Sequence, residues 1–446
     1  MRKLYNTGII LKVLFLLAFY FWDVALITSG HNTMNPVLRS EQIQPIPNRV
    51  RNELSDLDEF QHLESAIAFM LGKFDIKGAS VAVAKDGRLV FAKGIGFADK
   101  EADELVEPRH MFRIASVSKL ITATAIMRMT ELNLIGIDDR VFGEVGILND
   151  SIYLDYVDLR AEDITVRHLL NHSAGWNSRF GDHMFMPHLI AREMKVDGSV
   201  QVSDIIRFAL KRRLHYNPGT RTSYSNLGYA ILGEIIETVS GMKYEDYVRE
   251  TILFPLGIQE MRLGKNLKAD RFENEVKYYE QENALKVSSI YDIREKVPMA
   301  YGGNDIKTLG AAGGWIASPV EILKLVVAID GLAGEPDILS PESIQLMTDA
   351  GQSRGHTIGW TGSDGRGNWW RTGTFAGTSA LVMRQNNGLS WAVFFNSSTY
   401  RGTTLSREIN HEVQMALNKI NTWPEHDLFY YFETPPYLYP DIAELR

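Results

Sequence analysis

The sequence predicts a mixed α/β fold of the α+β type, in which strands from both ends of one domain close a single sheet around a helical insertion. Two β-hairpins near opposite ends of the chain indicate this, because each has β-rich arms around a turn that contains glycine. The arms are residues 80–84 and 89–93 around Asp86-Gly87, and 379–384 and 389–396 around Asn386-Asn387-Gly388. Helices are expected at residues 59–74 and 405–420, next to the hairpins.

Composition narrows the class of protein. Hydrophobic residues make up 45% and charged residues 23% of the 446, which is typical of a globular chain. Lys and Arg total 47 against 55 Asp and Glu, and the net charge of −8 argues against a nucleic-acid partner. The sequence has no cysteine, which excludes disulfides, thiolate catalysis and cysteine-ligated metals.

The N-terminus resembles an export segment. Arg2 and Lys3 precede an apolar run at 13–22, within a longer stretch, 9–28, that Lys12 and Asp23 interrupt. An uninterrupted run of this length suits a signal peptide better than a membrane-spanning helix. We expect residues 1–30 to direct export to the periplasm or the outside of the cell. The alternative is an uncleaved anchor that tethers the protein to a membrane through 9–28.

The rest of the chain divides into three parts. Residues 31–52 contain three prolines and predict a linker. Residues 53–420 form the expected domain, with a helical lobe inserted at about 135–300. Residues 421–446 are rich in aromatic residues and proline and are expected to form a packed tail rather than a domain.

Two S-x-x-K patterns could supply a serine nucleophile, Ser116 with Lys119 and Ser240 with Lys243. Ser116 opens a long helical pattern, and a helix N-terminus stabilises a developing negative charge. Lys119 lies one turn on, where burial would lower its pKa and make it a base. Ser240 instead ends a helix before Gly241, so Ser240 and Lys243 are expected to be structural.

Two further short motifs could complete the site. Tyr224-Ser225-Asn226 is the only Y-x-N in the chain and lies between a turn and a helix. A phenol beside a lysine can transfer a proton, and an asparagine amide can donate to a substrate carbonyl. Taken alone, the tripeptide fits an ordinary core tyrosine with a capping asparagine better than a catalytic pair.

Arg371-Thr372-Gly373-Thr374 precedes the second hairpin. Gly373 allows close approach of a substrate to a strand edge, and Thr374 N–H could pair with Ser116 N–H around an oxyanion. Arg371 is a fixed positive charge suited to a carboxylate.

The order of these motifs resembles the serine β-lactamase-related superfamily, in particular its class C β-lactamase, D-Ala-D-Ala carboxypeptidase and esterase branch. Further similar segments extend the resemblance over roughly residues 60–420; they are 168–175, 216–241, 255–257 and 310–314. The resemblance implies a β-lactamase/transpeptidase-like fold, an antiparallel sheet flanked by helices plus an all-helical lobe, with the active-site cleft between them. It also implies that Ser116 is acylated, that Lys119 and Tyr224 activate it and the deacylating water, and that Asn226 and Arg371 to Thr374 bind substrate.

One residue departs from the family pattern, because Arg371 stands where family members usually carry Lys or His. Arginine keeps its attraction for a carboxylate but cannot exchange a proton. This departure counts against β-lactam hydrolysis in particular, and leaves acyl-enzyme chemistry on another amide or ester.

Metal chemistry is not expected. His168 and His172 are four residues apart, but no H-E-x-x-H motif is present. Trp360, Trp369 and Trp370 are candidates for the core or for the cleft wall, with the core favoured.

The predicted function is therefore a serine hydrolase that needs no metal or cofactor and acts on a small-molecule or short-peptide amide or ester. D-amino-acid peptides, β-lactams and simple esters are candidate substrates. The alternative is a non-catalytic relative that binds cell-wall peptides or senses β-lactams. The sequence does not indicate the oligomeric state.

Overall fold

The computed structural model describes residues 50–334, 336–351 and 357–429. All of them belong to one compact unit, Ile46–Arg446. The expected export segment, nearly all of the expected linker and the end of the aromatic tail lie outside the described residues. Among the described residues, no helix combines the length and the apolar character needed to cross a bilayer.

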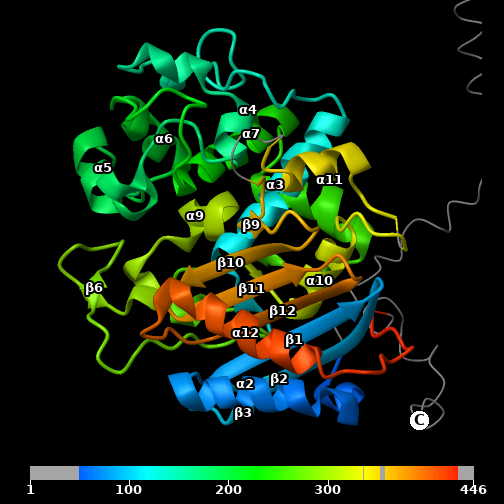
Figure 1. The fold of residues 1–446 in the computed structure, drawn as a ribbon. Coiled ribbons are helices and arrows are strands. Elements are labelled where there is room, and N and C mark those ends of the chain that lie inside the picture. The colour runs from blue at the N-terminus through cyan, green and yellow to red at the C-terminus, as the bar shows by residue number, and fades with distance from the viewer. Residues whose placement is uncertain (1–49, 335, 352–356, 430–446) are drawn as a thin grey trace, which may run out of the picture. The chain divides into compact units, whose positions relative to one another are not determined.

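A seven-stranded antiparallel sheet forms the centre, with the strand order β3-β2-β1-β12-β11-β10-β9 (Figure 1). The N-terminal strand β1 pairs directly with the C-terminal strand β12, so both ends of the domain close one sheet, as predicted. The strands are β1 (Gly78–Lys85), β2 (Arg88–Asp99), β3 (Glu104–Leu105), β9 (Gly362–Ser363), β10 (Trp369–Phe375), β11 (Thr378–Arg384) and β12 (Leu389–Phe395).

Both predicted hairpins are confirmed. Asp86 and Gly87 take positive φ angles of 50° and 81° at the first turn, and Gly388 takes 83° at the second. Strands β11 and β12 are buried along their whole length, and β1 is buried at every residue but its last, because helices cover both faces of the sheet at this point. Side chains alternate along β12, so that Trp391 and Val393 face one hydrophobic core while Ala392 and Phe394 face the other.

Two helix layers sandwich the sheet. Helices α2 (Gln61–Phe74) and α12 (Leu405–Leu417) pack on one face, through Leu63, Ile67, Ile409 and Val413. Figure 1 shows both helices in front of the sheet. Helices α3 (Ser118–Glu131) and α10 (Pro319–Val327) belong to the larger core behind it.

A mostly helical part lies above the sheet in Figure 1. Its helices are α4 (Val166–Leu170), α5 (Pro187–Met194), α6 (Val202–Leu210), α7 (Asn226–Ser240), α8 (Tyr244–Val248) and α9 (Ile306–Gly313). Helix α11 (Pro341–Thr348) follows α10. Short strands make two further small sheets: β4 (Phe112–Arg113), β8 (Trp315–Ala317) and β5 (Arg262–Leu263), and β6 (Val287–Ser288) with β7 (Lys296–Val297).

Helix α3 is central because it carries the predicted nucleophile motif into the core. From Ser118 to Ala125 every residue is buried, including the polar Thr122 and Thr124. The hydroxyls of these threonines donate to main-chain carbonyls, Thr122 to Ser118 and Thr124 to Leu120, which satisfies them without water. A helix buried all round holds its first turn rigidly, and Ser116 lies immediately before that turn.

Candidate active site

Ser116 lies on a tight turn before α3. Residues Ala115–Val117 form one turn of 3-10 helix, and Ala115 has a φ of 47°, in the left-handed region that alanine rarely adopts. Such a conformation costs about 1–2 kcal/mol, and the packing around it must hold it in place. The result is a half-buried serine whose side chain lies at the surface end of a fully buried helix.

Lys119 lies one turn deeper and is 0% exposed. Its Nζ lies 3.4 Å from Ser116 Oγ, 2.7 Å from Asn226 Oδ1 and 2.5 Å from the main-chain oxygen of Ala312. A neutral amine has two N–H donors and one lone pair. Because Asn226 and Ala312 present acceptors, they can take both donors and leave the lone pair directed at the serine hydroxyl.

The surroundings lower the pKa of Lys119 to about 8, mainly because burial removes the ammonium from water and also because Arg371 is close. About a tenth of the amine is therefore neutral at pH 7, and about half at pH 8. This is the protonation state that a general base requires.

Tyr224 reaches the same serine from the helical part of the fold. Its Oη lies 2.5 Å from Ser116 Oγ, and Lys119 Nζ lies 4.9 Å from the centre of its ring. Burial raises the pKa of Tyr224, but the positive charges of Lys119 and Arg371 outweigh that effect, and the net pKa is below its usual value. The three predicted catalytic side chains are thus in contact.

The position of Tyr224 is set by the start of α7 and by His172. Ser225 caps α7 by accepting from the N–H of Gly228, and the N–H of Ser225 itself donates to His172 Nδ1. The His172 ring lies 4.7 Å from the Tyr224 ring, centre to centre. His172 has a φ of 61°, so a second uncommon backbone conformation supports the site.

Asn226 bridges the lysine to an acidic residue that the sequence reasoning missed. Its Oδ1 accepts from Lys119, and its Nδ2 donates to Asp182 Oδ2 over 2.7 Å. These two bonds fix which way the amide points. Asp182 is itself anchored, because its Oδ1 accepts from the N–H of Met184. The predicted donation from Asn226 to a substrate carbonyl would have to use its second amide hydrogen.

Arg371 is placed differently from the sequence expectation. Only 2% of its surface is exposed, and its Nε–H donates to the main-chain oxygen of Ser116 over 2.7 Å. Its Nη2 is buried without a hydrogen-bond partner in the described part of the chain. Arg371 therefore lies behind the nucleophile, where it supplies positive charge and fixes the turn, rather than at the surface where it would meet a carboxylate.

Gly373 lies against the backbone of Ile114 and Ser116, whereas the sequence predicts that it lets a substrate approach the strand. A Cβ at this position would lie 2.1 Å from the main-chain oxygen of Ile114 and 3.2 Å from the nitrogen of Ser116. Strand β10 therefore packs directly on the backbone that leads to the nucleophile, and any side chain here would push the two apart.

Thr374 provides a main-chain N–H donor at the edge of β10 that faces away from β11. The N–H of Thr372 points away from β11, because it donates to Thr361 Oγ1 beyond the other edge of β10. Amides two residues apart in a strand point the same way, so the N–H of Thr374 also faces this edge, beside Ser116. The arrangement fits the predicted oxyanion hole. The Thr372 side chain, in contrast, lies on the opposite face of the sheet and bonds Thr361.

The second S-x-x-K pattern has no catalytic surroundings. Ser240 is the last residue of α7, and Gly241 follows it with a φ of 70°. The Ser240 hydroxyl donates to the carbonyl of Ile236, and Lys243 forms an exposed ion pair with Glu237. These contacts agree with the prediction that Ser240 and Lys243 are structural residues.

The histidine pair also has structural contacts. His168 belongs to a capping box at the start of α4, where its Nδ1 accepts from the N–H of Thr165. Within the described ranges, no group of three or more metal-ligating side chains is present.

The fold and the contact of serine, lysine and tyrosine define a class, the serine β-lactamase and transpeptidase-like proteins. The chain belongs to the Beta-lactamase family, whose model matches residues 63–413.

Individual relatives are distant. Penicillin-binding protein 4* of Bacillus subtilis strain 168 is 27% identical over 217 residues, which are 48% of this chain and 44% of the relative. The chain thus spans less than half the length of the curated relatives it matches.

Solved structures show the same fold. The octameric penicillin-binding protein homologue from Pyrococcus abyssi has a TM-score of 0.61 at 25% identity, over 81% of this chain and 78% of that one. D-amino acid amidase from Ochrobactrum anthropi SV3, in complex with D-phenylalanine, has a TM-score of 0.62 at 21% identity, over 82% and 100%.

Proposed function

We propose that this protein is a serine hydrolase that forms an acyl-enzyme at Ser116 with a small amide or ester. The observation that carries the proposal is the contact of Ser116 Oγ with Tyr224 Oη at 2.5 Å and with Lys119 Nζ at 3.4 Å. Family membership supports it, and so do solved relatives described as an amidase and as a hydrolase with acyltransferase activity.

In the proposed reaction, the Lys119–Tyr224 pair takes the proton of Ser116 as Oγ bonds to the substrate carbonyl carbon. The N–H groups of Ser116 and Thr374 stabilise the oxyanion. The pair then returns the proton to the leaving nitrogen or oxygen as its bond to carbon breaks. A water molecule repeats the sequence on the acyl-enzyme and releases the acid product.

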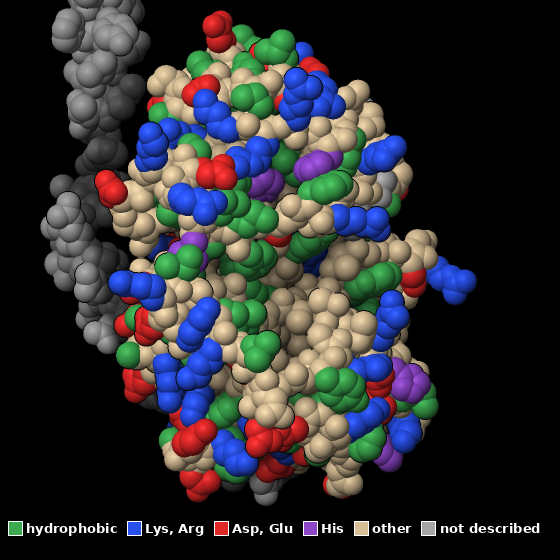
Figure 2. Space-filling model, turned by 90° about the vertical axis from the view of Figure 1, so that its left-hand side faces the viewer, with side chains coloured by type: hydrophobic (Ala, Val, Ile, Leu, Met, Phe, Trp, Pro, Cys, Tyr) green, Lys and Arg blue, Asp and Glu red, His purple; other side chains and the backbone are tan. Residues whose placement is uncertain are grey.

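An apolar groove beside the site suggests which substrates fit. The groove has a volume of about 510 Å³ and begins at Phe375, one residue beyond Thr374. Phe185 and Met299, both partly exposed, form its walls, and the Phe185 and Phe375 rings lie 6.2 Å apart. Figure 2 shows this side of the molecule hollowed between the helical part and the sheet. We propose that an apolar group next to the scissile carbonyl occupies this groove.

The buried position of Arg371 favours substrates without a carboxylate over β-lactams. Its guanidinium is already bonded to the Ser116 carbonyl and is closed to solvent. We therefore expect apolar esters and amides to turn over faster than nitrocefin.

Labelling tests the proposal. A fluorescent fluorophosphonate should modify the wild-type protein at Ser116, located by peptide mass analysis, and should not modify Ser116→Ala. Labelling that persists in Ser116→Ala would contradict the assignment of the nucleophile. Turnover of p-nitrophenyl esters, nitrocefin and D-Ala-D-Ala peptides then separates the hydrolase from a sensor or binding protein, which would be acylated once and would not turn over.

We also propose that residues 1–30 direct export, on the strength of Arg2 and Lys3 before the apolar run at 13–22. Mass analysis of the mature protein from a secreting host tests this. A mature chain that begins near residue 30 supports a cleaved signal, and an intact N-terminus in the membrane fraction supports the anchor.

A further inference from the structure

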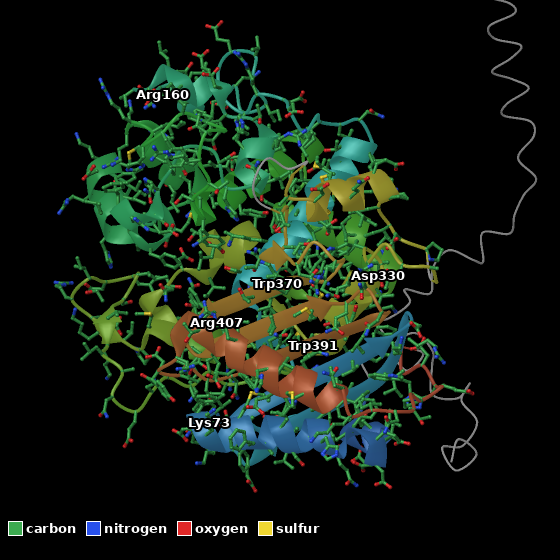
Figure 3. All side chains as sticks on the ribbon, viewed as in Figure 1. Lys73, Arg160, Asp330, Trp370, Trp391 and Arg407 are labelled. Atoms are coloured by element: carbon green, nitrogen blue, oxygen red, sulfur yellow. The ribbon has the colours of Figure 1, made fainter. Side chains whose placement is uncertain are left out.

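A second groove lies on the face of the sheet opposite Ser116. Side chains alternate along β10, so Arg371 and Gly373 face the nucleophile while Trp370 and Thr372 face the side that carries α12. Helix α12 does not cover the outer strands β9 and β10, and a groove of about 610 Å³ remains beside it. Figure 3 shows Trp370 and Arg407 on this same face.

The floor of the groove is apolar and is built around one indole. Trp370 is partly buried, and its cross-strand partner on β11 is Met383, while Thr372 pairs with Leu381. On the other side Trp370 pairs with Gly362 of β9. A Cβ on Gly362 would lie 2.5 Å from the indole, so glycine is what makes room for the ring here. The ring is therefore held in place before any ligand arrives.

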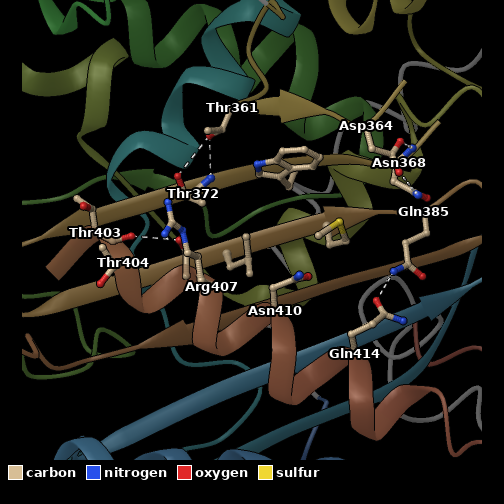
Figure 4. A pocket seen from close by; sticks show the side chains of 14 residues that line it. Thr361, Asp364, Asn368, Thr372, Gln385, Thr403, Thr404, Arg407, Asn410 and Gln414 are labelled. Carbon is tan, nitrogen blue, oxygen red and sulfur yellow. Dashed lines mark hydrogen bonds between the residues drawn. The ribbon is translucent and has the colours of Figure 1, made fainter. Parts of the chain in front are cut away.

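The wall of the groove is polar. Arg407, Asn410 and Gln414 follow one face of α12 at spacings of three and four residues and line the groove (Figure 4). Arg407 and Asn410 are exposed, and their side chains make no hydrogen bond or ion pair in the part of the chain that the structure describes. Gln414 accepts from Gln385, which closes one end of the wall.

We propose that this groove binds a short acidic oligosaccharide. A fixed indole offers its face to the C–H surface of a sugar ring, and side-chain amides and hydroxyls match sugar hydroxyls as both donors and acceptors. From Arg407 to Gln414 the helix rises about 10 Å, which accommodates about two sugar rings. The unpaired guanidinium of Arg407 fits a carboxylate on the ring at that end.

The chemistry of the groove disfavours other ligands. A nucleic acid would need several cations along its path, whereas Arg407 is the one unpaired cation in the described lining, and the chain has a net charge of −8. An apolar peptide would leave the amides of Asn410 and its neighbours unsatisfied. The proposal is independent of the acyl-enzyme chemistry, because no catalytic side chain lines this groove.

Calorimetry on the full chain tests the proposal with two probes, trigalacturonic acid as the acidic ligand and cellotriose as the neutral one. We expect the acidic probe to bind about tenfold more tightly, since one charge-assisted contact is worth roughly that factor. Added salt should remove the difference. Arg407→Gln should weaken the acidic probe about tenfold and leave the neutral probe unchanged. Arg213→Gln is the matched control, because it removes an exposed arginine in the helical part.

Trp370→Leu should abolish binding of both probes. Circular dichroism and thermal unfolding serve as the folding check for each variant. Arg407→Gln, at an exposed site, keeps the test decisive if Trp370→Leu fails to fold. Absence of binding by both probes overturns the proposal. Binding that Arg407→Gln and Trp370→Leu leave unchanged overturns it too, and so does equal competition by inorganic sulfate, which would indicate a simple anion site.

Discussion

Arg371 donates its Nε–H to the main-chain oxygen of Ser116, so a guanidinium group ties strand β10 to the turn that carries Ser116. The same charge lowers the pKa values of both Lys119 and Tyr224. Arg371 thus combines a structural bond to the Ser116 turn with an electrostatic effect on Lys119, the proposed general base.

The pH dependence of acylation should report this effect. Because the pKa of Lys119 is about 8, the acylation rate should rise with pH through that value as the amine loses its proton. Arg371→Gln removes a positive charge that disfavours the ammonium, so the profile should move to higher pH. A rise of about 1 in the pKa lowers the neutral fraction at pH 7 about tenfold. Stopped-flow labelling across pH measures it, and Arg371→Lys should keep the wild-type midpoint. An unchanged midpoint in Arg371→Gln would contradict the electrostatic role.

Asp182 should act in the opposite direction. Its negative charge raises the pKa of Lys119, against the larger effects of burial and Arg371. Asp182→Asn keeps an acceptor for Asn226 but loses the charge, so the midpoint of the acylation profile should move to lower pH. Asp197→Asn, at an exposed site in the same part of the fold, is the matched control and should leave the midpoint in place. A shift to higher pH in Asp182→Asn would show that the loss of amide positioning dominates.

Phe185 should determine the preference for apolar substrates. Phe185→Ala removes one wall of the groove beside Thr374, so kcat/KM for p-nitrophenyl octanoate should fall roughly tenfold while the acetate ester changes little. Phe180→Ala is the control, because that ring is 73% exposed and stacks on His215. Equal losses of kcat/KM with both esters would show that Phe185→Ala disturbs the geometry around Ser116 and does not change the preference for apolar substrates.

Gly373→Ala should abolish acylation, because the added methyl group would lie 2.1 Å from the Ile114 oxygen and force β10 away from Ser116. We expect a loss of at least about 100-fold, the cost of a displaced oxyanion donor. The comparison is Gly72→Ala in α2, where a Cβ meets no atom within 4 Å. That change should stabilise the protein by about 0.5–1 kcal/mol and leave acylation unchanged. Thermal unfolding measures the stability of each variant, and labelling measures its acylation. Normal labelling of Gly373→Ala would contradict the close contact between β10 and Ile114.

Glu321 should make stability fall as pH rises. Burial, together with repulsion from Glu260, raises its pKa to about 7 from 4.5. Between these values the folded state binds more protons than the unfolded state, so the free energy of unfolding decreases with increasing pH. Above pH 7 the raised pKa of Glu321 lowers the free energy of unfolding by about 3 kcal/mol in total. Glu321→Gln should therefore be more stable than wild type at pH 8 and equal to it at pH 4.5, by urea denaturation. A difference that does not vary with pH would exclude this linkage.

Local signals were sufficient for much of the fold and for the three central residues. Turn chemistry at Asp86-Gly87 and Asn387-Gly388 predicts both hairpins, since few residues adopt positive φ. The spacing of Ser116 and Lys119 places them on one helical face, and the position of Tyr224 before α7 lets it reach them. Each of these relations depends on neighbours within a few residues or on a motif order that the family shares.

The remainder depends on tertiary contacts. Asp182 belongs to no motif, and its role arises only because the loop before α5 folds over Asn226. The alternation along β10 predicts that Arg371 and Thr372 face opposite ways, but not which of them faces Ser116. The left-handed conformation of Ala115 has no signal in an alanine side chain. The sequence predicts that Arg371 and Gly373 contact the substrate. In the structure, both residues instead contact the backbone around Ser116.

The pairing of β1 with β12 has a consequence for biosynthesis. Ser116 leaves the ribosome early, whereas Arg371 and Thr374, which complete its surroundings, follow more than 250 positions later, and β12 later still. Until β10 has been made, a nascent chain therefore holds Ser116 without the strand that packs on its turn. The predicted site can therefore assemble only after β12, the last strand of the sheet in chain order, has been synthesised.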